Sequence, residues 1–207
     1  MKKYIAILLS VFVLFGVSAC NSTTPNKTEP TKQEETQDNT DSKDIHDNDI
    51  AAETTELAEF DITGDEFIDA MNDVLEITHP DLVLTDLKTE ESEKDGVKQI
   101  IYYTMENDVF VSYTVNKDSN NIYLFDTIIE NDSLNENTHF NASIYFATAV
   151  SILDSETEIN DLIENLNMTD YTSTNGTFYK SNKAEYTKVT ADNKFSFIIR
   201  ATNNNNW

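Results

Sequence analysis

Cysteine, proline, glycine and basic residues are all scarce in this chain of 207 residues. One cysteine cannot form an intramolecular disulfide, and 3 prolines and 4 glycines exclude the collagen-like and glycine- or proline-rich classes. Only 14 basic residues stand against 38 acidic ones, so the formal net charge is -24. This charge repels phosphate backbones, and nucleic acid is therefore excluded as a partner.

Apolar residues make up 39% of the chain, less than the roughly 45 to 50% that is usual in globular domains. The 11 phenylalanines and 9 tyrosines are nevertheless too many for a wholly disordered chain. We therefore expect one part of the chain to fold and another part to remain unfolded.

The sequence also lacks the motifs of nucleophilic, nucleotide and metal chemistry. His46, His79 and His139 are the only histidines, and none lies in an HExxH or other spaced pair. No G-x-S-x-G, S-x-x-K, P-loop or G-x-G-x-x-G motif is present. We expect a protein that is not an enzyme, without catalytic residues, cofactor or metal.

An acidic stretch before Gly96 has some features of a calcium-binding loop. Glu91, Glu93 and Asp95 resemble the alternating oxygen ligands of a calcium loop, but Tyr102 stands where a bidentate glutamate would close it. The stretch is therefore predicted to be a solvated acidic loop over 86–95.

The amino-terminal residues have the pattern of an export signal. Lys2 and Lys3 precede an apolar run over 5–17, which at 13 residues is shorter than the roughly 20 that a permanent membrane helix needs. The tetrapeptide Val17-Ser18-Ala19-Cys20 resembles the lipobox of bacterial lipoprotein signal peptides, with Val17 where leucine is commoner.

This resemblance implies how the chain is processed and where it is located. By analogy with bacterial lipoproteins, the signal peptide 1–19 is cut off between Ala19 and Cys20. The sulfur of Cys20 carries a diacylglyceryl group, and the new amino terminus can be acylated as well. Two acyl chains, at about 0.8 kcal/mol per buried methylene, hold a protein firmly on a membrane. The expected location is the extracellular face of a bacterial cell membrane.

The composition changes near residue 57. Residues 20–56 are rich in Glu, Asp, Thr, Asn and Lys and contain no aromatic residue, so we expect the lipidated cysteine to be followed by a disordered acidic tether. Such a tether would span on the order of 30 to 36 Å. The folded domain is predicted over 57–202, followed by a frayed tail over 203–207.

Two capping boxes and a buried helix are predicted within the domain. Thr63 and Glu66 form the first box, at the start of a helix over 64–77 that ends before His79 and Pro80. Asn141 is predicted to cap a central buried helix over 142–153. A second box over 155–158 is predicted to begin a short amphipathic helix.

The remaining segments with recurring hydrophobic residues are predicted to form strands. Three of them, over 97–105, 109–115 and 122–129, form a predicted meander, with Asn107 or Asp108 in a left-handed turn position. Four more are predicted over 171–173, 177–180, 184–190 and 194–201. Strands separated by helices favour an α+β fold with an antiparallel sheet, and their order would fit a duplicated α-βββ unit.

The charges are distributed unevenly along the domain. Residues 60–140 carry 19 acidic and 4 basic residues, whereas residues 171–207 carry two acidic and five basic ones. A basic strand face bearing tyrosines is the predicted binding surface. It consists of Lys180, Lys183, Lys188, Tyr179 and Tyr186. The alternative is that these lysines solvate an edge strand and pair with the acidic half.

Three functional hypotheses follow. The first is a monomeric, non-catalytic surface lipoprotein whose domain binds a protein or an envelope polymer. The second is an immunity or inhibitor lipoprotein against a toxin, phage component or enzyme, acting through the acidic first helix and the 86–95 loop. The third is a carboxylate-dependent hydrolase, for which Asp126 is the best residue because it interrupts an apolar strand. An outward-facing or edge position is the plainer interpretation of Asp126.

Overall fold

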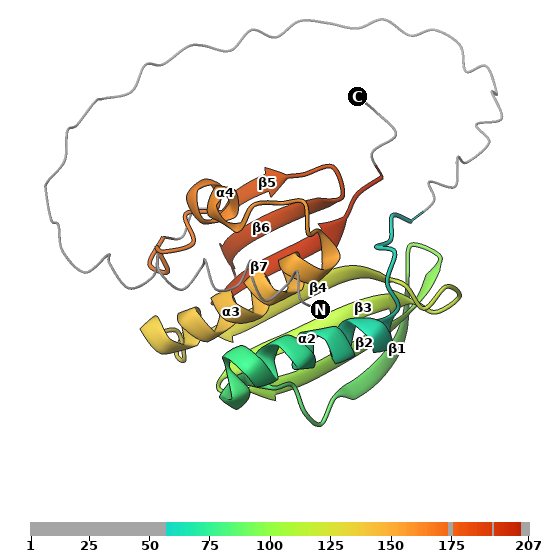
Figure 1. The fold of residues 1–207 in the computed structure, drawn as a ribbon, viewed down its shortest axis with the longest axis horizontal. Helices are drawn as coiled ribbons and strands as arrows, with labels where there is room; N and C mark the ends of the chain where they lie inside the picture. Colours follow the sequence, from blue (N-terminus) through green and yellow to red (C-terminus); the bar gives the residue numbers. More distant parts are fainter. Residues whose placement is uncertain (1–56, 174–175, 192, 204–207) are drawn as a thin grey trace, which may run out of the picture.

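The computed structural model describes residues 57–173, 176–191 and 193–203, which fold into one antiparallel sheet with helices on one face (Figure 1). The seven strands are arranged in the order β1-β2-β3-β4-β7-β6-β5. They are β1 (Lys88–Lys94), β2 (Val97–Glu106), β3 (Val109–Asn116), β4 (Ile122–Glu130), β5 (Thr177–Lys180), β6 (Ala184–Ala191) and β7 (Lys194–Ala201). The helical segments are α2 (Gly64–Thr78), the 3-10 turn η1 (Pro80–Leu82), α3 (Glu136–Leu153) and α4 (Ile159–Asn165). The predicted α+β class is confirmed.

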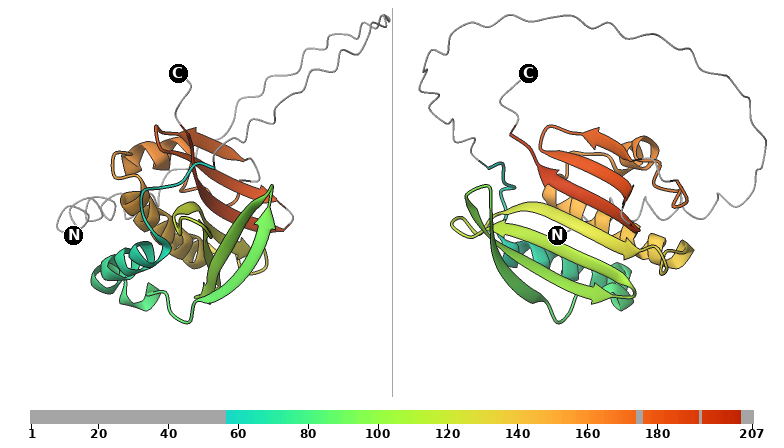
Figure 2. Two further views of the ribbon diagram at one scale, coloured as in Figure 1. Left: turned by 90° about the vertical axis from the view of Figure 1, so that its right-hand side faces the viewer. Right: turned by 180° about the vertical axis from the view of Figure 1, so that it is seen from behind.

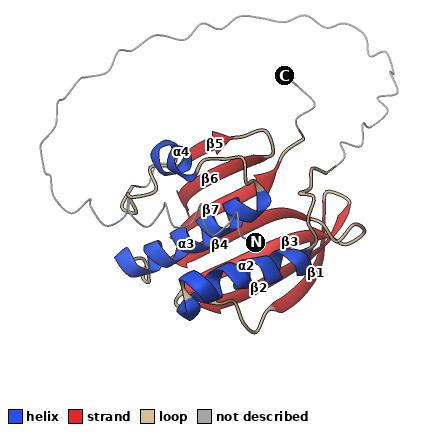
Figure 3. Ribbon diagram, viewed as in Figure 1, coloured by secondary structure: helices blue, strands red, loops and turns tan. Residues whose placement is uncertain are grey.

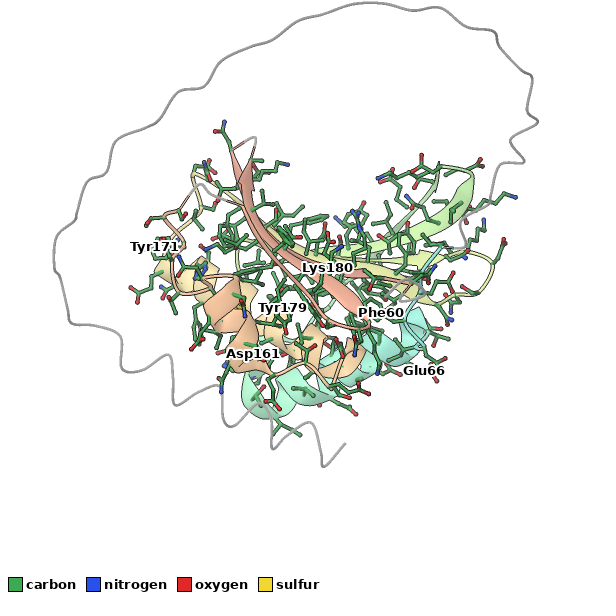
Figure 4. All side chains as sticks on the ribbon, turned by 90° about the horizontal axis from the view of Figure 1, so that it is seen from above. Phe60, Glu66, Asp161, Tyr171, Tyr179 and Lys180 are labelled. Atoms are coloured by element: carbon green, nitrogen blue, oxygen red, sulfur yellow. The ribbon has the colours of Figure 1, made fainter. Side chains whose placement is uncertain are left out.

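The molecule has two layers. Helices α2 and α3 lie across the same face of the sheet, as the views in Figures 2 and 3 show. None of the described helices lies on the other face. The two ends of the sheet rise away from the helices, so the uncovered face is concave (Figure 4).

Helix α2 begins as the sequence predicts. Thr63 Oγ1 accepts a hydrogen bond from the Glu66 amide at 3.4 Å, and the Glu66 carboxylate accepts one from the Thr63 amide at 3.1 Å. The helix buries Phe67, whose ring packs edge-on against Tyr113 and Phe125, with centroids 5.4 and 5.8 Å away. Apolar spacing and a local cap thus place this helix on β3 and β4.

Helix α3 begins earlier than predicted. Asn135, not Asn141, is its N-cap: Asn135 Oδ1 accepts from the amides of Asn137 at 2.9 Å and Thr138 at 3.2 Å. The Thr138 hydroxyl accepts from the Asn135 amide at 3.0 Å, which completes a reciprocal cap. Asn141 lies inside the helix. The prediction missed this start because the third helical position holds threonine rather than the usual glutamate.

The predicted capping box over 155–158 is wrong. Thr157 instead donates its hydroxyl to Asp154 at 2.7 Å, and α4 begins at Ile159 without a side-chain cap. The predicted strand over 171–173 is also wrong, because Asp170 holds this segment in a turn. Its carboxylate accepts from the amides of Thr172 and Ser173 at 2.9 and 3.2 Å. Local side-chain hydrogen bonds compete with regular structure at both places.

The predicted acidic loop over 86–95 is largely a strand. Residues 88–94 form β1, an edge strand that pairs along its whole length with β2. Asp95 and Gly96 form the connecting turn with φ angles of 54° and 79°, and Asn107 and Asp108 form the next turn at 51° and 62°. The charges on β1 are compatible with a strand because its side chains are exposed at a sheet edge.

The strand order fits a repeated unit. Strands β2-β3-β4 and β5-β6-β7 are two meanders, and their last strands, β4 and β7, lie side by side. Helices α2 and α3 precede the two meanders, while β1 and α4 have no counterpart in the other half. The duplication of an α-βββ unit stays a prediction.

His139 is a buried histidine between the two layers. Its ring packs against the rings of Tyr171, Phe195 and Phe197, with centroids 5.4, 5.1 and 5.7 Å away. Its Nε2 has no hydrogen-bond partner among the described residues. Burial, together with the nearby charge of Lys188, lowers the pKa of His139 to about 4.

Acid should therefore destabilise the fold through His139. The unfolded chain takes up this proton near pH 6.5, whereas the folded chain takes it up only near pH 4, so stability falls as pH drops between these values. The loss amounts to about 3 kcal/mol. We expect His139→Leu to lose less stability than the parent protein between pH 7 and pH 4, as measured by urea denaturation. Equal losses in both proteins would contradict this assignment.

Candidate functional site

The uncovered side of the sheet is the concave face. Its members are the alternate side chains that point away from the helices, as the strand register shows. They are Lys88, Glu90, Ser92 and Lys94 (β1); Val97, Gln99, Ile101, Tyr103 and Met105 (β2); Phe110, Ser112, Thr114 and Asn116 (β3); Leu124, Asp126, Ile128 and Glu130 (β4); Lys194, Ser196, Ile198 and Arg200 (β7); Glu185, Thr187, Val189 and Ala191 (β6); and Phe178 and Lys180 (β5).

Asp126 lies at the centre of this face. It belongs to β4, the middle strand of the seven, so the predicted edge position is wrong. The outward-facing alternative is correct, in that the side chain points away from the helices. One cross-strand row passes through it from edge to edge. That row is Lys88, Tyr103, Ser112, Asp126, Ile198, Thr187 and Phe178.

The carboxylate of Asp126 has few partners. Its Oδ1 accepts a short hydrogen bond from the Ser112 hydroxyl. No basic side chain lies within ion-pair distance of it among the described residues. Burial raises the pKa of Asp126, and the Ser112 hydrogen bond opposes that rise. The centre of the face is thus an incompletely satisfied carboxyl group in partly apolar surroundings.

A chain of polar contacts fixes one wall beside this centre. The Tyr123 hydroxyl donates to Gln99 Oε1, and Gln99 Nε2 donates to Ser92 Oγ at 2.6 Å. Burial raises the pKa of Tyr123, opposed by the positive charge of Arg200, so the hydroxyl is a neutral donor at physiological pH. These hydrogen bonds connect β4, β2 and β1 and hold this part of the concave face in place.

A groove runs over β1 to β4 and onto β7. It encloses about 690 Å³, within the roughly 300 to 1,000 Å³ of ligand sites. Its apolar lining includes Ile101, Tyr103, Phe110 and Leu124, and the rings of Tyr103 and Phe110 stack with centroids 5.6 Å apart. Asp126 and Ser112 are also among its lining residues.

Large apolar side chains are also exposed elsewhere on the concave face. Met105 on β2 is 60% exposed, and Phe178 on β5 is 70% exposed. Aromatic residues, methionine and arginine are the types enriched in protein interfaces, and this face holds all three. It has the composition of a recognition surface.

The charges of the concave face differ from those of the rest of the domain. Residues 57–203 contain 28 acidic and nine basic residues. Five of the nine basic residues are on the concave face, but only four of the acidic ones. The helix layer is correspondingly acidic. Much of the negative charge is therefore kept off the concave face, which is nearly neutral.

The predicted binding residues do not share one exposed surface, so that prediction is corrected. Lys188 is 1% exposed and Tyr186 is fully buried, with its hydroxyl donating to Asp154 at 2.7 Å. Tyr179 is opposite Tyr186 on the helix side of the sheet. Lys180 pairs with Glu185 at 2.9 Å, and Lys183, in the turn, pairs with Glu156 at 3.3 Å. The alternation of β6 turns its lysine and tyrosine inward together.

Other predicted residues lie outside the described part of the chain or are dispersed within it. The lipidation and cleavage residues Ala19 and Cys20, the tether and His46 fall before residue 57. His79 is the C-cap of α2, while His139 is buried in the core. The described residues contain no cluster of three His, Cys, Asp or Glu side chains that could hold a metal ion.

Comparisons of the chain with protein-family models, with curated proteins and with solved structures give no significant match. Within the described ranges, no helix is long and apolar enough to cross a bilayer. The function is therefore inferred from the geometry of the concave face.

The concave face left a signal in the sequence that the prediction did not use. A strand with one buried face alternates, but β2 carries four apolar residues in succession over 100–103. Such a run means that both faces are apolar. Ile100 and Tyr102 pack toward the core, while Ile101 and Tyr103 line the groove. The sequence alone cannot tell whether a second layer covers that second face.

Proposed function

We propose that the protein is a lipid-anchored binding protein on the extracellular face of a bacterial membrane, and that it binds a partner protein on the concave face. The proposal retains the lipobox of the signal sequence and replaces the lysine and tyrosine surface with the concave face. No catalysis is assigned to it.

One observation carries the proposal: no helix or strand among the described residues covers one whole face of the sheet, although that face carries large apolar side chains. Exposed apolar patches of this kind are typical of interaction sites. Helices cover the opposite face completely enough to bury Phe67, Phe146 and Phe197. The contrast between the two faces supports a role for the uncovered one in binding rather than in folding.

The hydrolase hypothesis gains no support from the structure. A glycosidase needs two carboxyl groups about 5 to 9.5 Å apart. Glu90 also lines the groove, but three strand spacings separate its strand from that of Asp126, about 14 Å along the sheet. No second carboxylate contacts Asp126 among the described residues.

Charge insertion on the concave face should abolish binding while leaving the fold intact. We expect the double variant Met105→Glu, Phe178→Glu to lose at least about 2 kcal/mol of binding free energy, roughly thirtyfold in affinity. Both side chains are mainly exposed, so stability should change by less than about 0.5 kcal/mol for each. The measurement is cross-linked capture of partners on intact producing cells, followed by mass spectrometry.

Ile77→Glu is the matched control. Ile77 is an apolar residue of α2 that is 64% exposed, but it lies in the helix layer. The same partner should be captured by this variant and by the parent protein. If Ile77→Glu loses the partner and the double variant retains it, the concave face is not the binding surface.

The inhibitor hypothesis remains a second candidate because of α2. The solvent side of α2 carries acidic residues whose side chains are exposed. Such an acidic surface suits an inhibitor of a basic protein. The acidic residues are Asp65, Glu66, Asp69, Asp73 and Glu76. Partner contacts mapped to α2 rather than to the concave face would favour this candidate.

A further inference from the structure

We infer that the centre of the concave face is a subsite for a basic side chain, a lysine or arginine of the bound protein, received by Asp126 and Ser112. This inference rests on the proposed function, because it names the partner chemistry of the same surface. It goes further in assigning one anchor position and its charge.

The Asp126 carboxylate is only partly paired within the domain. Asp126 Oδ1 is held by Ser112, whereas Oδ2 has no hydrogen-bond partner among the described residues. The residue directly opposite Asp126 on β7 is Ile198, whose side chain has no donor. A partly buried carboxylate costs free energy unless it is paired, and an incoming ammonium or guanidinium group would supply the pair.

The groove next to Asp126 has an apolar and aromatic lining. The stacked rings of Tyr103 and Phe110 lie next to Ser112 and Asp126 on the groove floor. A lysine or arginine can lay its methylene stem along Ile101 and Leu124 while its charged end contacts an aromatic face. The groove thus suits a long side chain with an apolar stem and a positive tip.

The net negative charge of the domain also favours a basic partner. The domain carries 28 acidic and nine basic residues, so its field attracts basic partners and repels acidic ones. The opposite assignment would be an anion bound to Arg200. Arg200 also lines the groove and has no ion pair within 4 Å among the described residues. Arg200 is exposed, however, whereas Asp126 is only partly exposed, so water hydrates the charge of Arg200 more fully than that of Asp126.

The test uses three small probes of matched stem length on the full chain in detergent micelles: butylguanidinium, butylammonium and butyrate. We expect the two cations to shift the backbone amide NMR signals of Tyr103, Ser112 and Asp126 saturably, and butyrate to leave them unchanged. Asp126→Asn should weaken cation binding about ten- to a hundredfold. Ser112→Ala, which retains the carboxylate, should weaken it less.

Arg200→Met separates the two charge assignments. It removes a like charge near the subsite, so cation binding should stay the same or become tighter. Butyrate binding that disappears in Arg200→Met would overturn the proposal in favour of an anion site. Failure of both cations to bind the parent protein, or cation binding that Asp126→Asn does not alter, would also overturn it.

Cell capture distinguishes this inference from the proposed function. If Asp126→Asn still captures the partner at full affinity while Met105→Glu, Phe178→Glu does not, the concave face binds but Asp126 is not its anchor. If all these variants capture the partner equally, the proposed function fails as well.

Discussion

Lys188→Glu should strongly destabilise the folded protein, whereas Lys180→Glu should leave its stability nearly unchanged. The Lys188 ammonium group donates to the backbone carbonyls of Asn167 at 2.7 Å and Asp170 at 2.8 Å, at 1% exposure. A glutamate there would place a negative charge against two carbonyl oxygens in the same buried space. The expected cost is about 3 to 5 kcal/mol, a large part of the roughly 5 to 15 kcal/mol that stabilise a domain.

Urea denaturation followed by circular dichroism measures this difference. Lys180 is the matched control because it is a lysine on the neighbouring strand, half-exposed, and paired with Glu185 at the surface. Its reversal should cost no more than about 1 kcal/mol. Equal stability of the two variants would mean that the lysine on β6 is not buried.

The second large effect is expected from Asp154→Ala. One carboxylate oxygen, Asp154 Oδ2, accepts from the hydroxyls of Thr157 at 2.7 Å, Ser181 at 2.6 Å and Tyr186 at 2.7 Å. Burial alone would raise the pKa of Asp154, but these three donors outweigh it and hold the pKa below its usual range. Removing the acceptor leaves the donors unsatisfied, so stability should fall by about 2 to 4 kcal/mol at pH 7.

The pH dependence of Asp154→Ala gives a second readout. Because the pKa of Asp154 is lowered on folding, its contribution to stability is present above about pH 4 and is lost as pH falls further. The difference in free energy of unfolding between Asp154→Ala and the parent protein should therefore become smaller in acid. Glu156→Ala, at an exposed residue two positions on, is the control and should cost less than about 1 kcal/mol. A stability difference between Asp154→Ala and the parent protein that does not change with pH would contradict the role assigned to the carboxylate.

Local signals in the sequence predict much of this fold. The reciprocal bonds of Thr63 and Glu66 involve residues three apart, so the start of α2 can be read directly from the sequence. The left-handed turn at Asn107 and Asp108 is equally local. Asn135 caps α3 by the same physics, but Thr138 replaces the glutamate by which such a cap is usually recognised.

Other errors occur where distant contacts decide the structure. Strand β1 is built almost entirely of charged and polar residues, and only its pairing with β2 makes it a strand. The prediction also took Lys188 for a surface residue because lysine is rarely buried. Its partners are carbonyl groups about 20 residues earlier in the chain, in the turn after α4.

The candidate site was only partly accessible to prediction from sequence. Asp126 could be singled out because it interrupts an apolar strand. Its neighbours on the concave face come from strands that the sheet order brings together, and Ser112 and Ile198 are 14 and 72 positions away. Within residues 57–203, as far as the structure describes them, no helix covers this face, and this depends on how all the described elements pack rather than on any one segment.

Site-directed photo-cross-linking on living producing cells tests the central claim most directly. A photoreactive phenylalanine analogue at position 178 places the probe on the concave face, and the same analogue at position 77 places it on α2. We predict a discrete light-dependent protein adduct from position 178 and none from position 77. An adduct from position 77 alone, or from neither position while the protein is folded and displayed, would contradict a partner-binding concave face.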